Sequence, residues 1–520
     1  MRFALSALPL AFLLLMAVAP VARLIAEGWG DGTEGFWALW QDAYLRGRVL
    51  WSLVQAGLSA LVCLLLGVPL AWVFARFEFP GRALLLRVLM LPFVVPTLVA
   101  ALGVLALFGP RGALGLDGSG TPWLLIYGNV FFNLCLIVRA GVDALEQVSA
   151  SRVAAARTLG ATPWRAFWRV EWPSLRPWFA SAVCLVFLYC LSGFGLALVL
   201  GGQAWATAEV EIYTLVAHEL ALGQAGVLAL WMLIINAVVA LVHAFIEQRL
   251  AVPTRADPIA RRTPRSWAEW LALAAAVAVF VLVAVSPLLA ILWRVTPSLT
   301  DGSALAVLAE PATLNALGNT LRFSASALLL ALLLGVLHAV SAHTLRQLGV
   351  AWRAAGFLPF VVSPVTVAFG LLLLYPQWTA SLPLLVAAYA LIAYPFITKA
   401  LTTALDALPA QLTQAAATLG ASPWRVFWRV RLPLVLPALR RGTAFAAATM
   451  LGEFAVSLFL SRPEWITLTT LIHQRLGRPG EANLQAALVL ATLLMALALT
   501  AFLLIEGRGR RAAIPHARTA

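Results

Sequence analysis

Long apolar runs alternate with short polar loops along the whole chain. A helix needs about 20 mostly apolar residues to cross a bilayer, and twelve runs meet that requirement. They lie near residues 5–26, 51–75, 86–109, 121–139, 179–201, 228–248, 268–295, 318–342, 352–375, 382–400, 441–461 and 484–505. Because every backbone polar group must be paired within lipid, runs of this length predict helices. The expected fold is all-α, a polytopic membrane protein of about 12 transmembrane helices.

Composition supports lipid as the main solvent of the chain. Hydrophobic residues make up 62% and charged residues only 11%, with a mean hydropathy of +0.92, whereas about a quarter of a soluble domain is charged. The net charge of +14 lies in short gaps between apolar runs and not on a solvated face, which argues against a nucleic-acid partner. The cysteines form no C-x-x-C pair and predict neither a metal site nor a disulfide framework; they are Cys63, Cys135, Cys184 and Cys190.

The distribution of basic residues predicts which loops face the cytoplasm. Most of the 36 arginine and lysine residues fall in one set of alternate loops, and cytoplasmic loops are the ones enriched in these residues. Both termini belong to that set. The sequence therefore predicts a multi-pass protein of the bacterial inner membrane with both termini in the cytoplasm. The opposite loops hold few basic residues, among them Arg462, Arg475 and Arg478.

The chain contains an internal repeat. Residues 158–173 read TLGATPWRAFWRVEWP, and residues 418–433 read TLGASPWRVFWRVRLP. A shorter identity, LPFVV, occurs at 91–95 and again at 358–362. An even number of spans per half gives both halves the same orientation. The sequence thus predicts two parallel six-helix repeats, related by an axis along the membrane normal.

The repeat divides the chain into two halves. The predicted parts are a first half at 1–252, a proline- and arginine-rich cytoplasmic linker at 253–266, a second half at 267–507 and a cytoplasmic tail at 508–520. In each half the longest match falls in the cytoplasmic loop between the fourth and fifth spans, at 143–177 and at 403–437. The strongest similarity between the halves therefore lies outside the membrane.

Each repeated loop encodes a short helix, a turn and a second helix. Three alanines are strong helix formers, a glycine then ends the first helix, and a proline starts the next one. These are Ala154–Ala156, Gly160 and Pro163 in the first copy, and Ala415–Ala417, Gly420 and Pro423 in the second. One interpretation is an amphipathic helix that lies on the lipid head groups. Duplication in register favours the other interpretation, a surface that docks into a partner protein.

The two loops resemble the EAA motif of the permeases of binding-protein-dependent ABC importers, E-A-A-x3-G-x9-I-x-L-P. In that family the motif is the coupling helix that docks into a groove on the nucleotide-binding subunit, so we call residues 154–173 and 414–433 the coupling segments. Ala154 and Gln414 replace the leading glutamate of the motif, so the resemblance does not carry over any polar contact that this glutamate makes with the ATPase. The resemblance assigns contact with the ATPase to Ala155, Ala156, Gly160, Pro173, Ala415, Ala416, Gly420 and Pro433.

This resemblance implies the type I ABC importer permease fold and a set of partners. An ABC ATPase, in two copies, would bind the coupling segments and hold ATP and Mg²⁺. A periplasmic substrate-binding protein would deliver the solute, and the chain itself would hold no cofactor. Fused permeases of this length resemble the thiamine and thiamine phosphate importers and the ferric-ion importers. Residues 40–45, 79–82 and 130–134 favour the thiamine group, with ferric ion as the alternative cargo.

Other classes of protein find less support in the residues. The phosphate-cradling motif G-x-x-x-x-G-K-[ST] is absent, because Lys399 is the only lysine, so the chain is predicted to be a transport subunit and not an enzyme. An ion-coupled secondary transporter is the alternative from another class, since such proteins often contain repeated halves. That kind of transporter should repeat best in its substrate-binding spans, whereas this chain repeats best in a cytoplasmic loop.

One ionisable residue inside a predicted span is a candidate for the translocation pathway, since lipid makes such residues costly. Glu453 lies in the eleventh run, and Gly193 occupies the equivalent place in the first half. A carboxylate that lines the path of a cation is one interpretation. A hydrogen-bonding role between helices is the other, and it is the one we favour. His338 and His343 lack a third ligand nearby, so no metal site is predicted.

Overall fold

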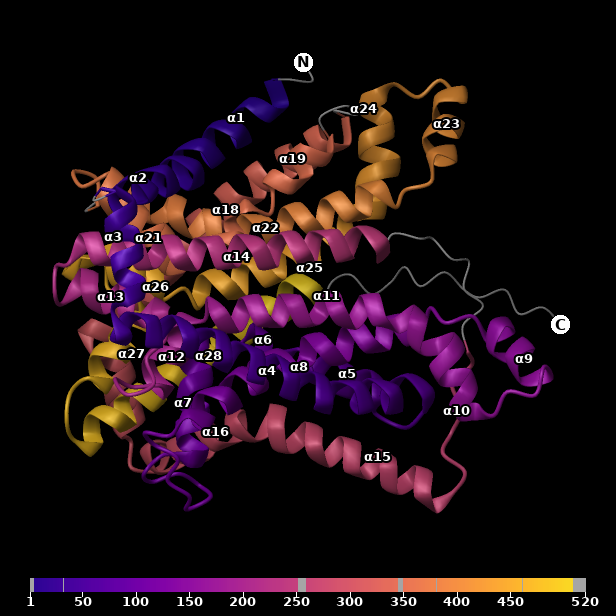
Figure 1. Cartoon of the computed structure of the whole chain (residues 1–520), viewed down its shortest axis with the longest axis horizontal. Helices are drawn as coiled ribbons and strands as arrows, with labels where there is room; N and C mark the ends of the chain where they lie inside the picture. The colour runs from indigo at the N-terminus through magenta and orange to yellow at the C-terminus, as the bar shows by residue number, and fades with distance from the viewer. Residues whose placement is uncertain are drawn as a thin grey trace. The chain divides into compact units, whose positions relative to one another are not determined.

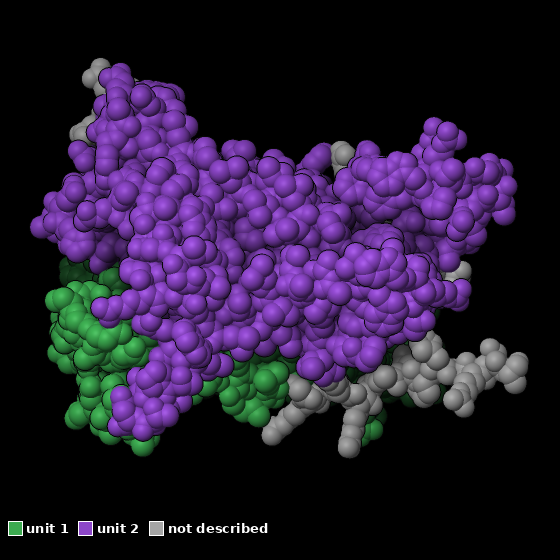
Figure 2. Space-filling model, turned by 90° about the horizontal axis from the view of Figure 1, so that it is seen from below, with its two compact units in different colours: residues 1–26, 302–520 green, residues 27–301 purple. Residues whose placement is uncertain are grey.

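The computed structural model describes residues 4–30, 32–250, 259–344, 349–379, 381–460 and 462–507. Within these ranges the chain consists of helices joined by loops, without a β-strand, and the predicted all-α fold is confirmed. The chain divides into two compact units, which Figure 2 colours separately. Unit 1 comprises residues 1–26 and 302–520, and unit 2 comprises residues 27–301.

Nine helices in the described ranges are long and apolar enough to cross a membrane. Six are unbroken α-helices: α4 (Ala43–Arg76), α8 (Pro122–Leu145), α14 (Leu222–Leu250), α18 (Pro311–Thr344), α22 (Leu382–Asp406) and α28 (Glu481–Gly507). Three continue through a π-helical turn: α1 (Ala4–Leu13), η1 (Leu14–Val18) and α2 (Ala19–Gly28); α10 (Pro163–Ala166), η2 (Phe167–Glu171) and α11 (Trp172–Leu191); α15 (Trp267–Phe280), η3 (Val281–Val285) and α16 (Ser286–Thr300). They account for eight of the predicted spans and for the first part of a ninth, 179–201, which breaks after Leu191 and continues as α12 (Phe194–Leu200).

The other three predicted spans are interrupted. The run 86–109 is divided among α5 (Arg82–Val88), α6 (Leu91–Val94) and α7 (Thr97–Phe108), and the chain bends by 105° before α7. The run 352–375 is divided among α19 (Gly349–Ala355), α20 (Leu358–Val361) and α21 (Pro364–Leu374). Pro96 and Pro364 lie at these breaks. Proline interrupts a helix because it lacks a backbone donor and disfavours helical geometry in the residue before it. The run 441–461 is divided between α25 (Leu432–Leu451) and α26 (Ala455–Leu460), and its last residue lies outside the described ranges.

The remaining helices are short and connect the spans. In unit 2 they are α3 (Gly32–Gln41), α9 (Ala150–Thr158), α12 (Phe194–Leu200) and α13 (Ala208–Ala217). In unit 1 they are α17 (Ser303–Ala309), α23 (Ala410–Thr418), α24 (Pro423–Val426), η4 (Phe427–Arg431), η5 (Pro463–Trp465) and α27 (Leu468–Leu476). In Figure 1, α9 and α10 lie beyond one end of α11, and α12 and α13 lie beyond the other. The span α11 therefore has the short helices α9 and α10 at one end and α12 and α13 at the other.

The first span of each predicted half packs in the unit that contains the rest of the other half. In unit 1, α1 packs against α18, and in unit 2, α16 packs against α7. The close approach depends on glycine in both units. A Cβ atom on Gly370 would lie 2.9 Å from the carbonyl oxygen of Pro20, and one on Gly103 would lie 2.9 Å from that of Pro287. The boundaries of the compact units therefore differ from those of the predicted halves, 1–252 and 267–507, because each first span is exchanged.

The end of the predicted linker is anchored in unit 2. Arg262 forms an isolated bridge with Phe77, and its N–H donates to the carbonyl of Arg76 at 3.1 Å. Arg261 forms ion pairs with Glu78 and Glu146 at 2.8 and 3.0 Å. The linker residues 259–266 thus lie against the end of α4. The linker residues 253–258 and the predicted tail 508–520 lie outside the described ranges.

Candidate functional site

The first coupling segment turns sharply between α9 and α10. Gly160 follows α9 in the left-handed conformation, with φ +82°, which glycine adopts without a Cβ penalty. The N–H of Ala161 donates to the carbonyl of Ala156 and the N–H of Gly160 to that of Arg157, both at 3.0 Å. These two bonds form a Schellman cap, which satisfies carbonyl groups left free at the end of a helix.

The second coupling segment repeats this geometry. Gly420 has φ +75°, the N–H of Ala421 donates to the carbonyl of Ala416 at 3.1 Å, and the N–H of Gly420 donates to that of Ala417 at 3.0 Å. The prediction that the two glycines end the first helix is confirmed. The following helix also starts alike, since Thr162 and Ser422 each accept a backbone N–H three residues on, at 3.3 and 3.4 Å.

Each coupling segment exposes large apolar side chains beside its turn. Leu159 and Leu419 are 88% and 87% exposed, and Trp164 and Trp424 are 69% and 70% exposed. The rings of Trp164 and Trp168 lie 5.5 Å apart, and the corresponding pair in the second copy lies 5.4 Å apart. Exposed apolar groups gathered in this way are typical of surfaces that bind another protein or a membrane.

The predicted contact residues fall into two groups within each segment. The carbonyl of Ala155 accepts the N–H of Leu159 at 3.1 Å and the hydroxyl of Thr158 at 2.8 Å, so it forms part of the cap that ends at the glycine. Pro173 lies apart from this cap, exposed in the first turn of α11. The second segment shows the same division, with Ala415, Ala416 and Gly420 at the cap and Pro433 in the first turn of α25.

One ion pair distinguishes the first coupling segment from the second. Glu171, which is buried at the end of η2, pairs with Arg76 at the end of α4. Arg431 occupies the place of Glu171 in the second copy, so this pair cannot form there. Since the backbone of Arg76 also contacts the linker, the first segment, α4 and the linker form one connected set. The sequence comparison shows the change from glutamate to arginine, but only the fold reveals the partner.

The structure places Glu453 in the break between α25 and α26. Its Oε1 accepts the N–H of Val456 at 3.0 Å, which caps the start of α26. Its carbonyl accepts the hydroxyl groups of Ser457 and Thr469 at 3.1 and 3.0 Å, and its side chain is buried. This arrangement is the one expected from the hydrogen-bonding interpretation, and a role in the pathway stays a prediction. Sequence reasoning did not identify Ser457 and Thr469, because nothing in their spacing indicates a shared partner.

The two histidines considered as metal ligands are engaged within unit 1. His338 Nδ1 lies 2.5 Å from the hydroxyl of Tyr394, and its Nε2 lies 2.9 Å from the carbonyl oxygen of Trp352. His343 Nδ1 lies 3.3 Å from a carboxylate oxygen of Asp406. Within the part of the chain that the structure describes, no three side chains of the types that bind metal converge on one point.

The fold and the repeated coupling segments define the class of protein. Membrane-spanning helices in two related sets, each with the same exposed segment, describe a membrane transport permease built from two halves. A family model described as "Binding-protein-dependent transport system inner membrane component" matches residues 64–252 and 327–508, one match in each half. The chain therefore belongs to this family of inner-membrane transport components.

Several curated proteins resemble the chain from end to end. The thiamine transport system permease protein ThiP of Escherichia coli K12 is 29% identical, over 95% of this chain and 94% of its own length. The protein of the same name from Salmonella typhimurium LT2 is also 29% identical, over 97% and 96%. The sulfate transport system permease protein CysW of Synechocystis is 32% identical over 44% of this chain but 88% of its own length. That relative therefore corresponds in length to a single half of this chain.

Proposed function

We propose that this chain is the permease subunit of an ABC importer that takes up thiamine or its phosphates. The observation that carries the proposal is the match over nearly the whole length of the thiamine permeases, in which both fused halves are included. A periplasmic binding protein delivers the solute, and a separate ATPase supplies the energy. The chain spans the inner membrane with both termini in the cytoplasm.

Docking of the ATPase at the coupling segments is supported by their geometry. Two copies of one capped turn, each with an exposed leucine and tryptophan, present two equivalent surfaces. A pair of identical ATPase subunits would find one surface on each half. The motif residues that the proposal assigns to contact with the ATPase are Ala155, Ala156, Gly160, Pro173, Ala415, Ala416, Gly420 and Pro433. ATP and Mg²⁺ are held by the ATPase, and this chain binds no cofactor.

Each coupling segment continues directly into a long helix, and this continuity supports a route by which movement of the ATPase reaches the membrane. The first coupling segment runs through α10 and η2 directly into the span α11, and the second runs through α24 and η4 into α25. A displacement of either segment by the ATPase would therefore be carried along a rigid helix into the membrane. Alternating access follows if ATP binding brings the ATPase subunits together and the two halves reorient around the pathway.

Reconstitution tests the class and the cargo together. The chain, the ATPase and the periplasmic binding protein of the same organism are placed in liposomes, and ATP hydrolysis is measured with thiamine or with ferric ion. We expect stimulation by thiamine alone. Stimulation by ferric ion alone would keep the architecture and replace the cargo. Uptake driven by a proton or sodium gradient, without stimulated hydrolysis, would contradict the ABC importer and favour a secondary transporter.

A further inference from the structure

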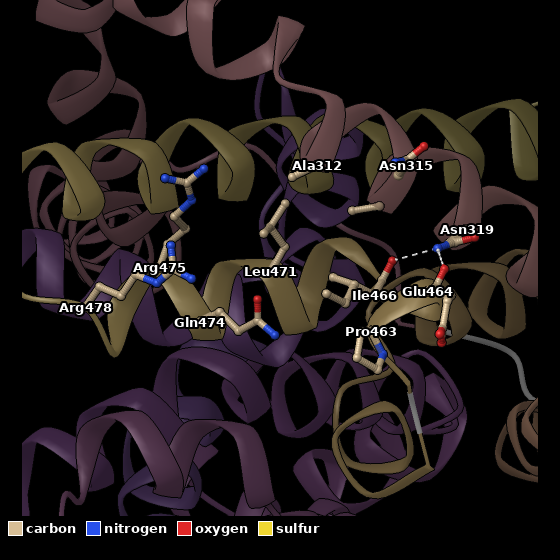
Figure 3. A pocket seen from close by; sticks show the side chains of 11 residues that line it. Ala312, Asn315, Asn319, Pro463, Glu464, Ile466, Leu471, Gln474, Arg475 and Arg478 are labelled. Carbon is tan, nitrogen blue, oxygen red and sulfur yellow. Dashed lines mark hydrogen bonds between the residues drawn. The ribbon is translucent and has the colours of Figure 1, made fainter. Parts of the chain in front are cut away.

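Unit 1 contains a pocket of about 340 Å³ at the end of α18. Its walls come from the first turns of α18, from the loop 463–466 and from α27 with the residues that follow it (Figure 3). Asn319 Nδ2 donates to the carbonyls of Glu464 and Ile466 at 2.9 and 3.1 Å, which holds the loop to the helix. Arg475 and Arg478 lie together at one end of the row of side chains, and Glu464 lies at the other.

The pocket and the second coupling segment lie at opposite ends of α18. This helix has 34 residues, which at 1.5 Å per residue gives a length of about 50 Å. Its first turns line the pocket, whereas His343 near its last turn contacts Asp406 at the end of α22. The chain then enters α23 of the coupling segment. If the coupling segments face the cytoplasm, as the proposed function requires, the pocket opens toward the periplasm.

The position equivalent to the pocket can be located in unit 2, because an equivalent hydrogen bond occurs in each unit and aligns the two copies of the repeat. In unit 2 the N–H of Ala208, the first residue of α13, donates to Oγ of Ser52 in α4 at 2.8 Å. In unit 1 the N–H of Leu468, the first residue of α27, donates to Oγ1 of Thr320 in α18 at 2.9 Å. With these residues superimposed, Tyr44 and Arg48 correspond to Ala312 and Ala316, and Glu211 corresponds to Leu471.

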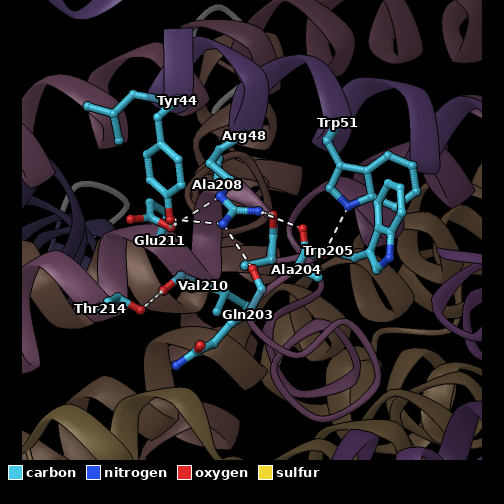
Figure 4. A network of polar contacts seen from close by, with 12 residues as sticks. Tyr44, Arg48, Trp51, Gln203, Ala204, Trp205, Ala208, Val210, Glu211 and Thr214 are labelled. Carbon is cyan, nitrogen blue, oxygen red and sulfur yellow. Dashed lines mark hydrogen bonds and ion pairs between the residues drawn. The ribbon is translucent and has the colours of Figure 1, made fainter. Parts of the chain in front are cut away.

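In unit 2 this place is filled by the chain's own side chains (Figure 4). The Tyr44 hydroxyl donates to Glu211 Oε2 at 2.9 Å, and Arg48 Nη2 donates to the Tyr44 oxygen at 2.8 Å. Arg48 Nε lies 3.4 Å from Glu211 Oε2, and its Nη atoms donate to the carbonyls of Gln203 and Ala204 at 2.9 and 3.0 Å. The guanidinium of Arg48 and the carboxylate of Glu211 thus form an ion pair inside unit 2.

In unit 1 the equivalent side chains are too small or too apolar to do this. Alanine replaces both the tyrosine and the arginine of α4, and Leu471 replaces the glutamate of α13. The guanidinium groups come instead from Arg475 and Arg478. Arg475 forms an ion pair with Glu310, which uses only part of its five donors. Arg478 is exposed, and its backbone N–H donates to the carbonyl of Arg475 at 3.2 Å. Within the described residues, its guanidinium group makes no hydrogen bond or ion pair.

We propose that this pocket receives an acidic side chain, aspartate or glutamate, of the periplasmic binding protein, so that only the second half of the permease provides an anchor for it. Charge complementarity carries the choice of occupant, because a carboxylate pairs well with the guanidinium fork. Leu471 stands in place of the carboxylate that fills the counterpart in unit 2, and the carboxylate of Glu464, which also lines the pocket, lies at the end away from the two arginines. This inference rests on the proposed function, since it needs a binding protein as partner.

Binding-protein-stimulated ATP hydrolysis tests the inference with the complete transporter in liposomes. The probe is the thiamine-loaded periplasmic binding protein of the same organism, titrated against wild type, Arg478→Glu, Arg478→Lys and Ala312→Tyr. We expect the half-saturating concentration to rise about tenfold in Arg478→Glu, equivalent to about 1.4 kcal/mol, and to change little in Arg478→Lys, which keeps the charge. Ala312→Tyr fills the pocket as Tyr44 does in unit 2 and should also weaken docking, whereas Ala306→Tyr, exposed on α17 outside the pocket, should not.

The outcomes separate this inference from the proposed function. A wild-type transporter that does not respond to the binding protein would overturn both. A wild type that responds, together with unchanged half-saturation in Arg478→Glu and Ala312→Tyr, would overturn the docking anchor alone. If the variants raise the half-saturating concentration only when thiamine phosphate is the cargo, the pocket holds a phosphate and not a protein carboxylate. If replacing one acidic residue of the binding protein with arginine restores the half-saturating concentration in Arg478→Glu, the anchor is supported and its partner is identified.

Discussion

Two glycines determine the shape of the coupling segments. Gly160 and Gly420 both have positive φ, and a Cβ atom added to either would meet open space within the chain. The strain of a substitution is therefore limited to the backbone, about 1–2 kcal/mol for a residue with a side chain in this conformation. A larger effect on function would have to come from a partner that approaches the glycine closely.

Substitution of these glycines separates docking from folding. We expect Gly160→Val or Gly420→Val to abolish uptake and to reduce the amount of ATPase that copurifies, while membrane insertion is retained. Gly302→Val is the matched control, since Gly302 also has positive φ, +79°, with no atom near its missing Cβ. Unchanged uptake in both coupling variants would contradict the docking assignment.

Glu453 offers a second test at the scale of single residues. If the carboxylate serves as a cap for α26, glutamine should replace it, because its carbonyl oxygen also accepts a backbone N–H. We expect Glu453→Gln to retain uptake and Glu453→Ala to lose about 1 kcal/mol of stability, measured as a lower melting temperature of the purified protein. Loss of uptake in Glu453→Gln without a change in melting temperature would instead place the charge in the pathway.

At the scale of elements, the coupling segments are short helices that end in exposed apolar residues. Burial within the chain does not explain Leu159 or Leu419, which contribute almost their whole surface to solvent. A membrane surface and a protein groove would both cover them. The two are distinguishable because a groove binds a defined shape, while a lipid surface accepts any apolar side chain.

Charge in place of these leucines should disrupt the contact with the ATPase. We expect Leu159→Asp with Leu419→Asp to lower the affinity of the ATPase at least about tenfold, with no change in melting temperature. Leu305→Asp in α17 is the control, because Leu305 is also largely exposed. In a further variant, Leu159→Phe with Leu419→Phe keeps apolar surface but changes its shape. Full ATPase binding by that variant would favour a lipid contact.

At the scale of the whole molecule, the exchange of first spans connects the two halves of the sequence. Each unit contains the first span of the other half, packed where a glycine lets two backbones approach. Because the same contact occurs in both units, neither sequence half contains all of the helices that pack in one unit. Because both halves are fused in one chain, each molecule contains one copy of each exchanged span.

The exchanged contacts predict a loss of stability on substitution. We expect Gly103→Leu and Gly370→Leu each to cost about 1–3 kcal/mol through overpacking, because their new Cβ atoms would lie against backbone that cannot move aside. Thermal unfolding of the purified protein measures the effect. Gly318→Leu in α18 is the control, since no atom lies within 4 Å of its missing Cβ. Equal melting temperatures for all three variants would contradict the exchange.

Much of the architecture could be predicted because lipid imposes simple rules. Length and apolarity identified nine spans directly, and the repeat located the coupling segments, the glycine turns and the proline starts. The broken spans were predicted as single helices, since hydropathy measures the solvent around a run but not its direction. Pro96 and Pro364 mark two of the breaks, but a proline within an apolar run is also compatible with a continuous kinked helix.

The sequence by itself determined the helical class, the number of related halves and the local form of the coupling segments, because these depend on hydrophobicity, periodicity and backbone preferences of nearby residues. Only the tertiary structure decided which first span packs with which unit, that Glu171 pairs with Arg76, and that an open pocket near Arg478 replaces the filled network around Arg48. These features depend on side chains that are far apart in the chain. Their distances follow from how the helices pack, which no local pattern encodes.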